Sequence, residues 1–307
     1  MVPCMIGRMT LTHESSSESS SDSDSGALRT LALRHLSPDA AERWLGLLRP
    51  GVRLAVAEDS DTVVGRLGGL PTLPADADWP TWEGHGPLSF IASIACAALP
   101  SDALDIPLPD EGTLLFFYFD GQLDDGDALV LAEDRDSWAG ARVLYVPAGA
   151  DTSQRAAPRV LEPYPVVPLT ARVTMTAAEP WHPQIRDAFA PGAPLGQRYD
   201  HPVCAQEFLD ALWEFDGTVG HRIGGHPRPV QNPVEVEIAA AVLDGEVPWD
   251  DPRLSDEAGG WVLLAQFDSE HAADMMWGDC GALYWLIRPQ DLAERRFERA
   301  VFTWQCG

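Results

Sequence analysis

Apolar runs of strand length recur along the chain and are separated by short polar connections. Six of them are rich in leucine, β-branched or aromatic residues and form two groups of three: Pro87–Ile94, Gly112–Phe119 and Arg142–Val146, then Trp261–Phe267, Gly281–Ile287 and Arg299–Trp304. Short apolar runs bounded by Gly, Pro and polar residues predict β-strands. The sequence therefore predicts two strand-rich regions on either side of a different middle segment.

A six-residue motif precedes each group of predicted strands. It reads RLGGLP at Arg66–Pro71 and RIGGHP at Arg222–Pro227. Glycine reaches backbone angles that other residues cannot, and the proline excludes a following helix, so the motif predicts a sharp turn and not a phosphate-binding loop. The same motif before the same series of strands predicts an internal duplication, with pseudo-symmetric halves at about 52–147 and about 217–307.

Helical patterns lie outside the predicted strands. One helix is expected to begin at Ser37-Pro38, where serine can cap the first turn. The connection at 148–216 is Pro-rich and expected to be irregular at first, and it ends in a helix that starts at Pro202. Another helix is expected from Asn232-Pro233 to Gly245. Strands in runs with a few packing helices favour an α+β fold with mostly antiparallel strands.

The N-terminal segment has the composition of an unfolded chain. Residues Glu14–Gly26 read ESSSESSSDSDSG, which offers too little apolar surface to offset the entropy lost on ordering. We expect a disordered, serine-rich and acidic tail at 1–26, followed by a single domain at 27–307.

The net charge of the chain disfavours some classes of binding partner. The 307 residues carry a formal net charge of −26, and all 21 basic residues are arginine, which is typical of a G+C-rich bacterial genome. Nucleic-acid binding depends on basic residues that displace counterions, so it is not expected here. A protein partner is compatible with this charge.

Cysteine usage and hydropathy suggest a location. The five cysteines form no C-x-x-C pair and no zinc-type spacing, which suits reduced thiols. No apolar run approaches the roughly 18 residues of a membrane helix. The chain is therefore expected to be cytoplasmic, and no membrane contact, metal or cofactor is predicted. Known catalytic motifs are also missing from the sequence, so whether the protein is an enzyme stays open.

The candidate site chemistry is concentrated near Trp277-Gly278-Asp279, a polar loop between two predicted strands. If those strands pair, Gln266, Asp268 and Asp279 could converge and bind a cation or a ligand hydroxyl. The structural alternative is favoured: an Asp after Gly commonly bonds nearby amides of a turn, and Trp277 would fill the core beneath the loop.

The two glycine turns carry further candidates. Arg66 and Arg222 occupy matching positions and could clamp an anion between the halves, or each could pair with neighbouring carboxylates. His221 and His226 flank the second turn, but no third residue has metal-ligand spacing, so hydrogen-bonded histidines are the favoured reading. Carboxylates near Trp79 after the first turn could bind a cationic or sugar-like ligand, although a solvated loop anchored by that tryptophan is favoured.

Several of these segments, in this order, resemble the YwqG-like proteins, a bacterial family known as domain of unknown function 1963. The resemblance covers roughly Val52–Gln305 and rests on these residues: Arg66–Pro71, Trp79-Pro80, Pro87–Phe90, Gly112–Phe117, Arg222–Pro227, Gln231, Leu263–Asp268 and Trp277–Leu283. It implies a duplicated α+β fold and an association of some members with toxin and immunity gene clusters, but no established activity. Family members often have a Gln where this chain has Ser93.

Two hypotheses about function follow. The first is a binding or interaction module, of an immunity or regulatory kind, with these candidate contact residues: Arg66, Arg222, Gln231, Gln266, Asp268, Trp277 and Asp279. The alternative is a small-molecule-binding protein or hydrolase that uses a cleft between the halves. In that case Gln266, Asp268, Asp279 and the two arginines would supply ligand contacts or acid–base groups.

Overall fold

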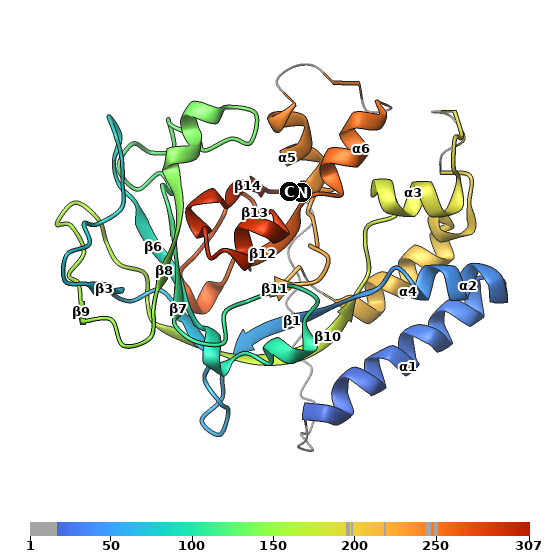
Figure 1. The fold of residues 1–307 in the computed structure, drawn as a ribbon, viewed down its shortest axis with the longest axis horizontal. Helices are drawn as coiled ribbons and strands as arrows, with labels where there is room; N and C mark the ends of the chain where they lie inside the picture. The colour runs from blue at the N-terminus through green and yellow to red at the C-terminus, as the bar shows by residue number, and fades with distance from the viewer. Residues whose placement is uncertain (1–16, 195–196, 198, 218, 244–246, 249–250) are drawn as a thin grey trace.

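A single antiparallel sheet of ten strands organises the computed structural model (Figure 1). The strand order is β14-β13-β12-β11-β1-β10-β2-β6-β7-β8. The structure describes residues 17–194, 197, 199–217, 219–243, 247, 248 and 251–307, with side chains from residue 24 onward. The strands of this sheet are β1 (Arg49–Val56), β2 (Gly65–Leu67), β6 (Ser89–Ala95), β7 (Thr113–Tyr118), β8 (Ala141–Val146), β10 (Val167–Thr176), β11 (His221–Gly224), β12 (Val262–Asp268), β13 (Ala282–Ile287) and β14 (Val301–Gln305).

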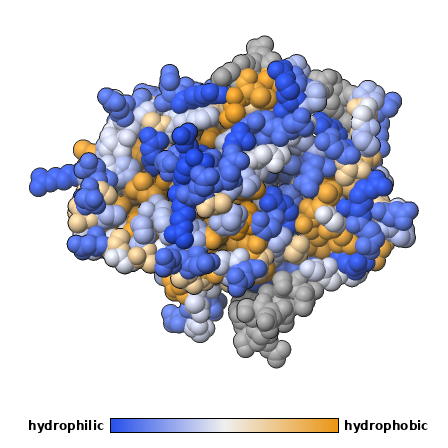
Figure 2. Space-filling model, in the orientation of Figure 1, coloured by the Kyte–Doolittle hydropathy of each residue, from blue (hydrophilic) through white to orange (hydrophobic). Residues whose placement is uncertain are grey.

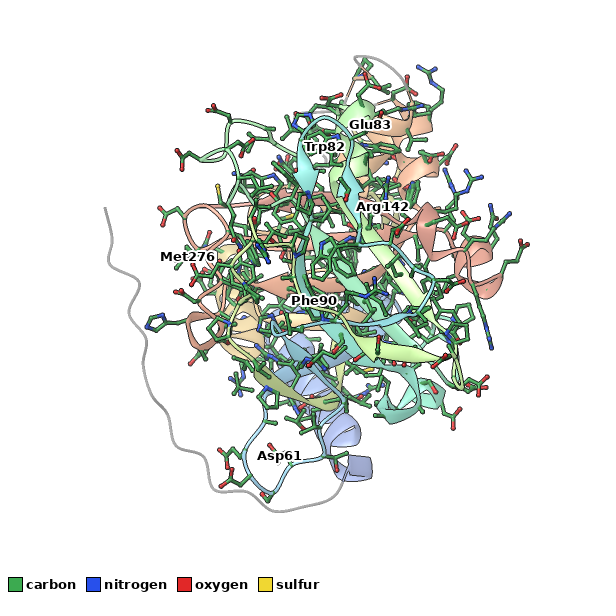
Figure 3. All side chains as sticks on the ribbon, turned by 90° about the vertical axis from the view of Figure 1, so that its left-hand side faces the viewer. Asp61, Trp82, Glu83, Phe90, Arg142 and Met276 are labelled. Carbon is green, nitrogen blue, oxygen red and sulfur yellow. The ribbon has the colours of Figure 1, made fainter. Side chains whose placement is uncertain are left out.

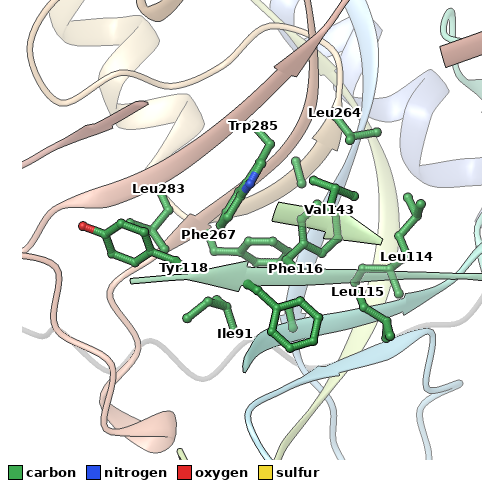
Figure 4. Close-up of a cluster of buried hydrophobic side chains, with 14 of the residues drawn as sticks. Ile91, Leu114, Leu115, Phe116, Tyr118, Val143, Leu264, Phe267, Leu283 and Trp285 are labelled. Atoms are coloured by element: carbon green, nitrogen blue, oxygen red, sulfur yellow. The ribbon is translucent and has the colours of Figure 1, made fainter. Parts of the chain in front are cut away.

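The sheet curls into a nearly closed barrel because strands far apart in the strand order pack against each other across its interior. Phe116 of β7 lies 5.0 Å from Phe267 of β12 and 5.3 Å from Trp285 of β13, between ring centroids. Tyr118 stacks on Phe302 of β14 at 4.7 Å. Figure 4 shows this aromatic core. Edge-to-face and offset ring packing of this kind fills the space between the two arms of the sheet.

Helices cover part of the outer face of the sheet. α1 (Ser17–His35), α2 (Pro38–Leu45), α3 (Pro183–Phe189) and α4 (Gln206–Asp216) form a second cluster beside β10. α5 (Val234–Val242) packs on the outer face of β13 and β14, with α6 (Pro252–Ala258) beyond it. In Figure 1 the first group lies at the right and the second at the top. The outer face of β2, β6 and β7 has no such helix over it among the described residues.

Smaller elements complete the described chain. β3 (Thr72–Pro74) pairs with β9 (Thr152–Gln154), and β4 (Thr81–Trp82) pairs with β5 (Gly86–Pro87). α7 (Pro289–Ala293) follows β13, and a 3-10 turn at Phe297–Arg299 places Phe297 against Tyr145 of β8. No helix of the described residues is both long and apolar enough to cross a membrane.

Most sequence predictions about elements are confirmed. All six predicted strands are present, within a few residues, and the sheet is antiparallel throughout. Both glycine pairs are turns with positive φ, of 61° and 75° in the first motif and 65° and 68° in the second. The helix after Ser37 is α2, and the Ser37 hydroxyl accepts a hydrogen bond from the amide of Ala40.

Two expectations about irregular segments were wrong. The Pro-rich connection contains β10, a ten-residue strand near the middle of the sheet. Within β10 the single proline is Pro168, at the second position, so the ladder with β1 is intact. The expected disordered tail also ends earlier than residue 26, because α1 begins at Ser17; residues 1–16 lie outside the described residues. α1 is anchored by Leu28 and Ala32, which pack into the helical cluster.

Candidate functional site

A row of side chains crosses the outer face of each arm of the sheet. In the second arm, Arg222 of β11 pairs with Gln266, Gln266 pairs with Tyr284, and Tyr284 pairs with Thr303. In the first arm the row is Arg66, Ser93, Leu115 and Leu144. Side chains that face each other across neighbouring strands point to the same side of a sheet. The two rows therefore occupy corresponding places, and they differ in what covers them.

The second row is closed by the segment that follows the glycine turn. The Gln266 amide oxygen accepts a hydrogen bond from the backbone N–H of Arg228 at 2.8 Å. Its amide nitrogen donates to the carbonyls of Val219 at 3.1 Å and Gly220 at 2.8 Å. The Tyr284 hydroxyl donates to the Arg228 carbonyl at 3.0 Å. Gln266 is fully buried with every polar atom bonded, so it holds loops together and has no free group for a ligand.

Arg222 is also committed to the protein. Its side chain is 2% exposed, and its Nη2 donates to the Asp216 carboxylate at 2.9 Å. Arg66 lies in β2, and strands β10 and β1 separate β2 from β11. Three strand spacings are roughly 14 Å, so the two arginines do not clamp one anion. The alternative prediction, in which Arg222 pairs with a neighbouring carboxylate, is confirmed.

Asp268 and its neighbours bind the loop before β11. The Asp268 carboxylate accepts from the amides of Gly220 at 2.8 Å and Ser269 at 2.9 Å. Burial raises the pKa of this carboxyl, although the two amides and His221 oppose the shift. The Asp268 amide in turn donates to Nδ1 of His221, whose Nε2 faces Glu270 at 3.7 Å. The polar groups of Asp268 and His221 are therefore all engaged by contacts within the protein.

The Trp277-Gly278-Asp279 loop divides into a buried and an exposed part. Trp277 is 4% exposed, and its indole N–H donates to the Asp268 carbonyl at 3.3 Å, so the prediction that it fills the core is confirmed. Asp279 is exposed, and its side chain bonds to none of the described residues. Its backbone carbonyl accepts from the amide of Gly307 at 3.0 Å. The expectation that the Asp279 carboxylate bonds amides of the turn, or converges on a ligand with Gln266, was therefore wrong.

Gln231 belongs to a second polar tie, between the end of β14 and the start of α5. Its amide nitrogen donates to the Cys306 carbonyl at 2.8 Å, while the residue stays exposed. The buried Gln305 amide accepts from the backbone of Val230 and Gln231, and it donates to Glu237 at 2.8 Å. Burial raises the pKa of Glu237 to about 7, against the opposing hydrogen bonds from Gln305 and Thr303.

The remaining candidates also have structural partners. His226 is fully buried, its ring bonds the Leu47 carbonyl at 2.9 Å, and burial lowers its pKa to about 3. Among the residues that the structure describes, no three His, Cys, Asp or Glu side chains are placed to hold a metal ion. Trp79 donates to the Leu88 carbonyl at 2.8 Å and packs edge-on against Phe117, as expected of a loop anchored by that tryptophan.

The first row borders an open groove of about 480 Å³. Its floor is formed by the outer faces of β2, β6 and β7, and its rim includes Val63 and Val166, whose exposed fractions are 53% and 58%. Figure 3 faces this side of the sheet, with Phe90 and Arg142 labelled. The groove is lined by Val63, Val64, Gly65, Arg66, Thr72, Ser93, Ala95, Thr113, Leu115, Val166 and Pro168. Figure 2 shows a different face, on which apolar patches alternate with polar ones.

Arg66 is the single charged residue of the groove lining. Its Nη2 donates to the Leu70 carbonyl at 2.6 Å, and its guanidinium lies 5.8 Å from the centre of the Phe90 ring. Nε and Nη1 have no hydrogen-bond partner among the described residues, and partial burial lowers the pKa of the group. Arg66 is therefore a half-buried cation with two donors left for a ligand.

Sequence reasoning identified Arg66 and missed the groove around it. The aromatic core fills the space between the two arms of the sheet, where the sequence analysis expected a cleft. The groove instead lies on the outside of one half. The sequence feature that indicates the groove is Ser93, a short residue at the position where Gln266 closes the second arm of the sheet. The rest of the lining consists of neutral residues from strands and loops far apart in the chain, which carry no motif.

Comparison with known proteins gives the family. The model of the domain of unknown function DUF1963 matches residues 65–306. The chain belongs to this family. The match spans both glycine turns and all strands from β2 to β14, so the resemblance noted from the sequence is confirmed. None of the curated proteins matches the chain significantly.

Proposed function

We propose that this DUF1963 protein is a binding module whose ligand occupies the groove beside Arg66. The proposed ligand is elongated, with a carboxylate at one end and an apolar body. The groove supports this size class, because ligand pockets commonly measure about 300–1,000 Å³. The observation that carries the proposal is the pairing of one half-buried guanidinium, with two donors unused, and an otherwise neutral and largely apolar lining.

The chemistry of the lining favours a carboxylate over other head groups. A guanidinium N–H makes a charge-assisted hydrogen bond to a carboxylate, and the partial burial of Arg66 weakens competition from water. Leu115, Ala95 and the rim valines then offer apolar contact to the body of the ligand. The hydroxyls of Ser93 and Thr113 can each accept or donate one further bond. The net charge of −26 repels polyanions, so a ligand with a single negative charge fits best.

An internal duplication explains why the groove is present in one half. The strand order runs outward from the central pair as β2-β6-β7-β8 on one side and β11-β12-β13-β14 on the other. We infer that the halves descend from one ancestral unit and that the first lost its closing residue. In the second half Gln266 reaches the segment after the turn. Ser93 is too short to make the equivalent bonds to the segment at Thr72.

A cytoplasmic location is also part of this proposal. The described cysteines, Cys96, Cys204, Cys280 and Cys306, form no disulfide with one another. This is compatible with a reducing compartment. The proposed ligand would then be a metabolite or a chain end present in that compartment.

Fluorescence titration with cis-parinarate, a fatty acid with an intrinsic fluorophore, tests the proposal. The wild type should bind it saturably and bind its neutral methyl ester at least tenfold more weakly. Arg66→Gln keeps a donor for the Leu70 carbonyl but removes the charge, and Ser93→Gln places the side chain of the closed half in the groove. Each should weaken binding at least tenfold.

Arg142→Gln is the matched control, because Arg142 is another half-buried arginine of the first half, in β8, but does not line the groove. Its dissociation constant should equal that of the wild type. Equal affinity in all four proteins, or no saturable binding of the acid by the wild type, would contradict the proposal.

A further inference from the structure

Three arginines of the described residues lie over tryptophan rings, and the two closest stacks, at Arg228 and Arg288, differ in one partner. Arg288 lies 4.4 Å above Trp261, and the carboxylate of Glu257 accepts hydrogen bonds from both the Arg288 guanidinium and the Trp261 indole. Arg228 lies 4.2 Å above Trp213. No described carboxylate bridges that second pair in the same way.

The unused donors of Arg228 are buried. The residue is 5% exposed, and its Nη1 faces Asp216 at 3.3 Å and Glu179 at 3.8 Å. Its Nε and Nη2 have no hydrogen-bond partner in the described part of the protein. These two nitrogens form the side-on fork that a guanidinium presents to a carboxylate. Leaving buried charged donors without hydrogen bonds costs free energy, so an acceptor is expected beside Nε and Nη2.

A small cavity borders Arg228. Its volume is about 20 Å³, and its polar lining consists of Arg228, Glu179 and Asp216. Leu28, Leu209 and Leu212 contribute apolar walls, and Trp213 forms another wall. Trp213 is 57% exposed and lies in the last turn of α4, before Gly217 with φ of 70°. The cavity has room for about one water, so a larger ligand would have to displace this ring outward.

The cavity is lined by groups of both charges. The carboxylates of Asp216 and Glu179 face Nη1 of Arg228, so they leave its Nε and Nη2 without an acceptor. Burial raises the pKa of Glu179, against the opposing effect of Arg228.

We propose that Arg228 and Trp213 form a binding site for a small monocarboxylate, of the size of formate or acetate. The carboxylate oxygens accept from Nε and Nη2 of Arg228, and Trp213 covers the ligand from outside. At Arg228 the bound anion would make the contact that the Glu257 carboxylate makes at Arg288. This site is separate from the groove at Arg66, so either proposal can fail without the other.

Isothermal titration of the full-length protein with sodium formate and sodium acetate, replacing sodium chloride at constant ionic strength, tests this site. The wild type should show saturable binding to one site. Arg228→Lys keeps the positive charge and the backbone ties to Gln266 and Tyr284, but removes the fork, so it should bind at least tenfold more weakly. Arg288→Lys is the matched control and should bind as the wild type does.

A second measurement covers the possibility that Arg228→Lys does not fold. Crystals of the wild type soaked in sodium acetate should show difference density for one carboxylate beside Arg228 and Trp213. Density for the anion only elsewhere, equal affinity of wild type and Arg228→Lys, or absence of saturable binding by the wild type would each overturn the proposal.

Discussion

Gln266→Leu should destabilise the fold strongly although it changes side-chain volume very little. Gln266 is fully buried and makes three hydrogen bonds, to the Arg228 amide and to the carbonyls of Val219 and Gly220. Leucine fills the same space, so no cavity opens. The three lost bonds are worth about 1 kcal/mol each, and the Arg228 amide is left buried without an acceptor. We expect the free energy of unfolding to fall by about 3–5 kcal/mol.

Urea denaturation, followed by both far-UV circular dichroism and tryptophan fluorescence, measures this change. With an m-value of about 3 kcal/mol/M, the midpoint should fall by roughly 1 M or more. Coincident transitions by the two probes are required for the comparison. Gln231→Leu is the matched control, because Gln231 is exposed and its single side-chain bond to the Cys306 carbonyl can be replaced by water. It should cost less than about 1 kcal/mol.

A loss below about 1 kcal/mol in Gln266→Leu, or one equal to that of Gln231→Leu, would refute the reasoning. It would mean that the loop at 219–220 and the segment at Arg228 hold their places without Gln266. The proposed origin of the groove would then fail as well, because it assigns the closure of the second half to this side chain.

Two further predictions concern carboxylates. Burial raises the pKa of Glu237 from 4.5 in the unfolded chain to about 7, so its contribution to stability is present below about pH 4.5 and is lost as the pH rises through 7. Between pH 5 and 8 the free energy of unfolding of the wild type should therefore fall relative to that of Glu237→Gln, and parallel pH profiles of the two proteins would contradict the assignment. Asp279→Ala should leave the melting temperature unchanged, because the side chain is exposed and bonds to no described residue; a drop of more than a few degrees would show a contact that the structure lacks.

Local chemistry was enough to predict most elements of this fold. The strands from Pro87 to Trp304 follow from apolar runs between turn residues, and the two Gly-Gly-x-Pro turns follow from the backbone angles that glycine alone adopts freely. β10 was missed because prolines at and before its start resemble those of an irregular connection. α1 was missed in part because its first turns consist of serine and acidic residues, while packing at Leu28 and Ala32 anchors the helix.

The candidate residues show what sequence spacing cannot decide. Gln266 and Asp268 both belong to β12, whose predicted strand ended at Phe267. The structure turns both side chains toward loops of the protein, and it leaves Asp279 in solvent. Arg66 and Arg222 begin similar motifs, RLGGLP and RIGGHP, but have different surroundings. Arg222 is paired with Asp216 and almost completely buried, whereas Arg66 borders a groove.

The sequence by itself determined the family, the strand segments, the turns and a negative charge that disfavours nucleic acid. Each of these depends on neighbouring residues or on composition. Only the tertiary structure decided that the two strand groups curl around one aromatic core and that β10 from the connection lies between them. It also decided where the groove and the Arg228 cavity lie. Both are lined by side chains from segments far apart in the sequence, so their positions and volumes depend on how those segments pack.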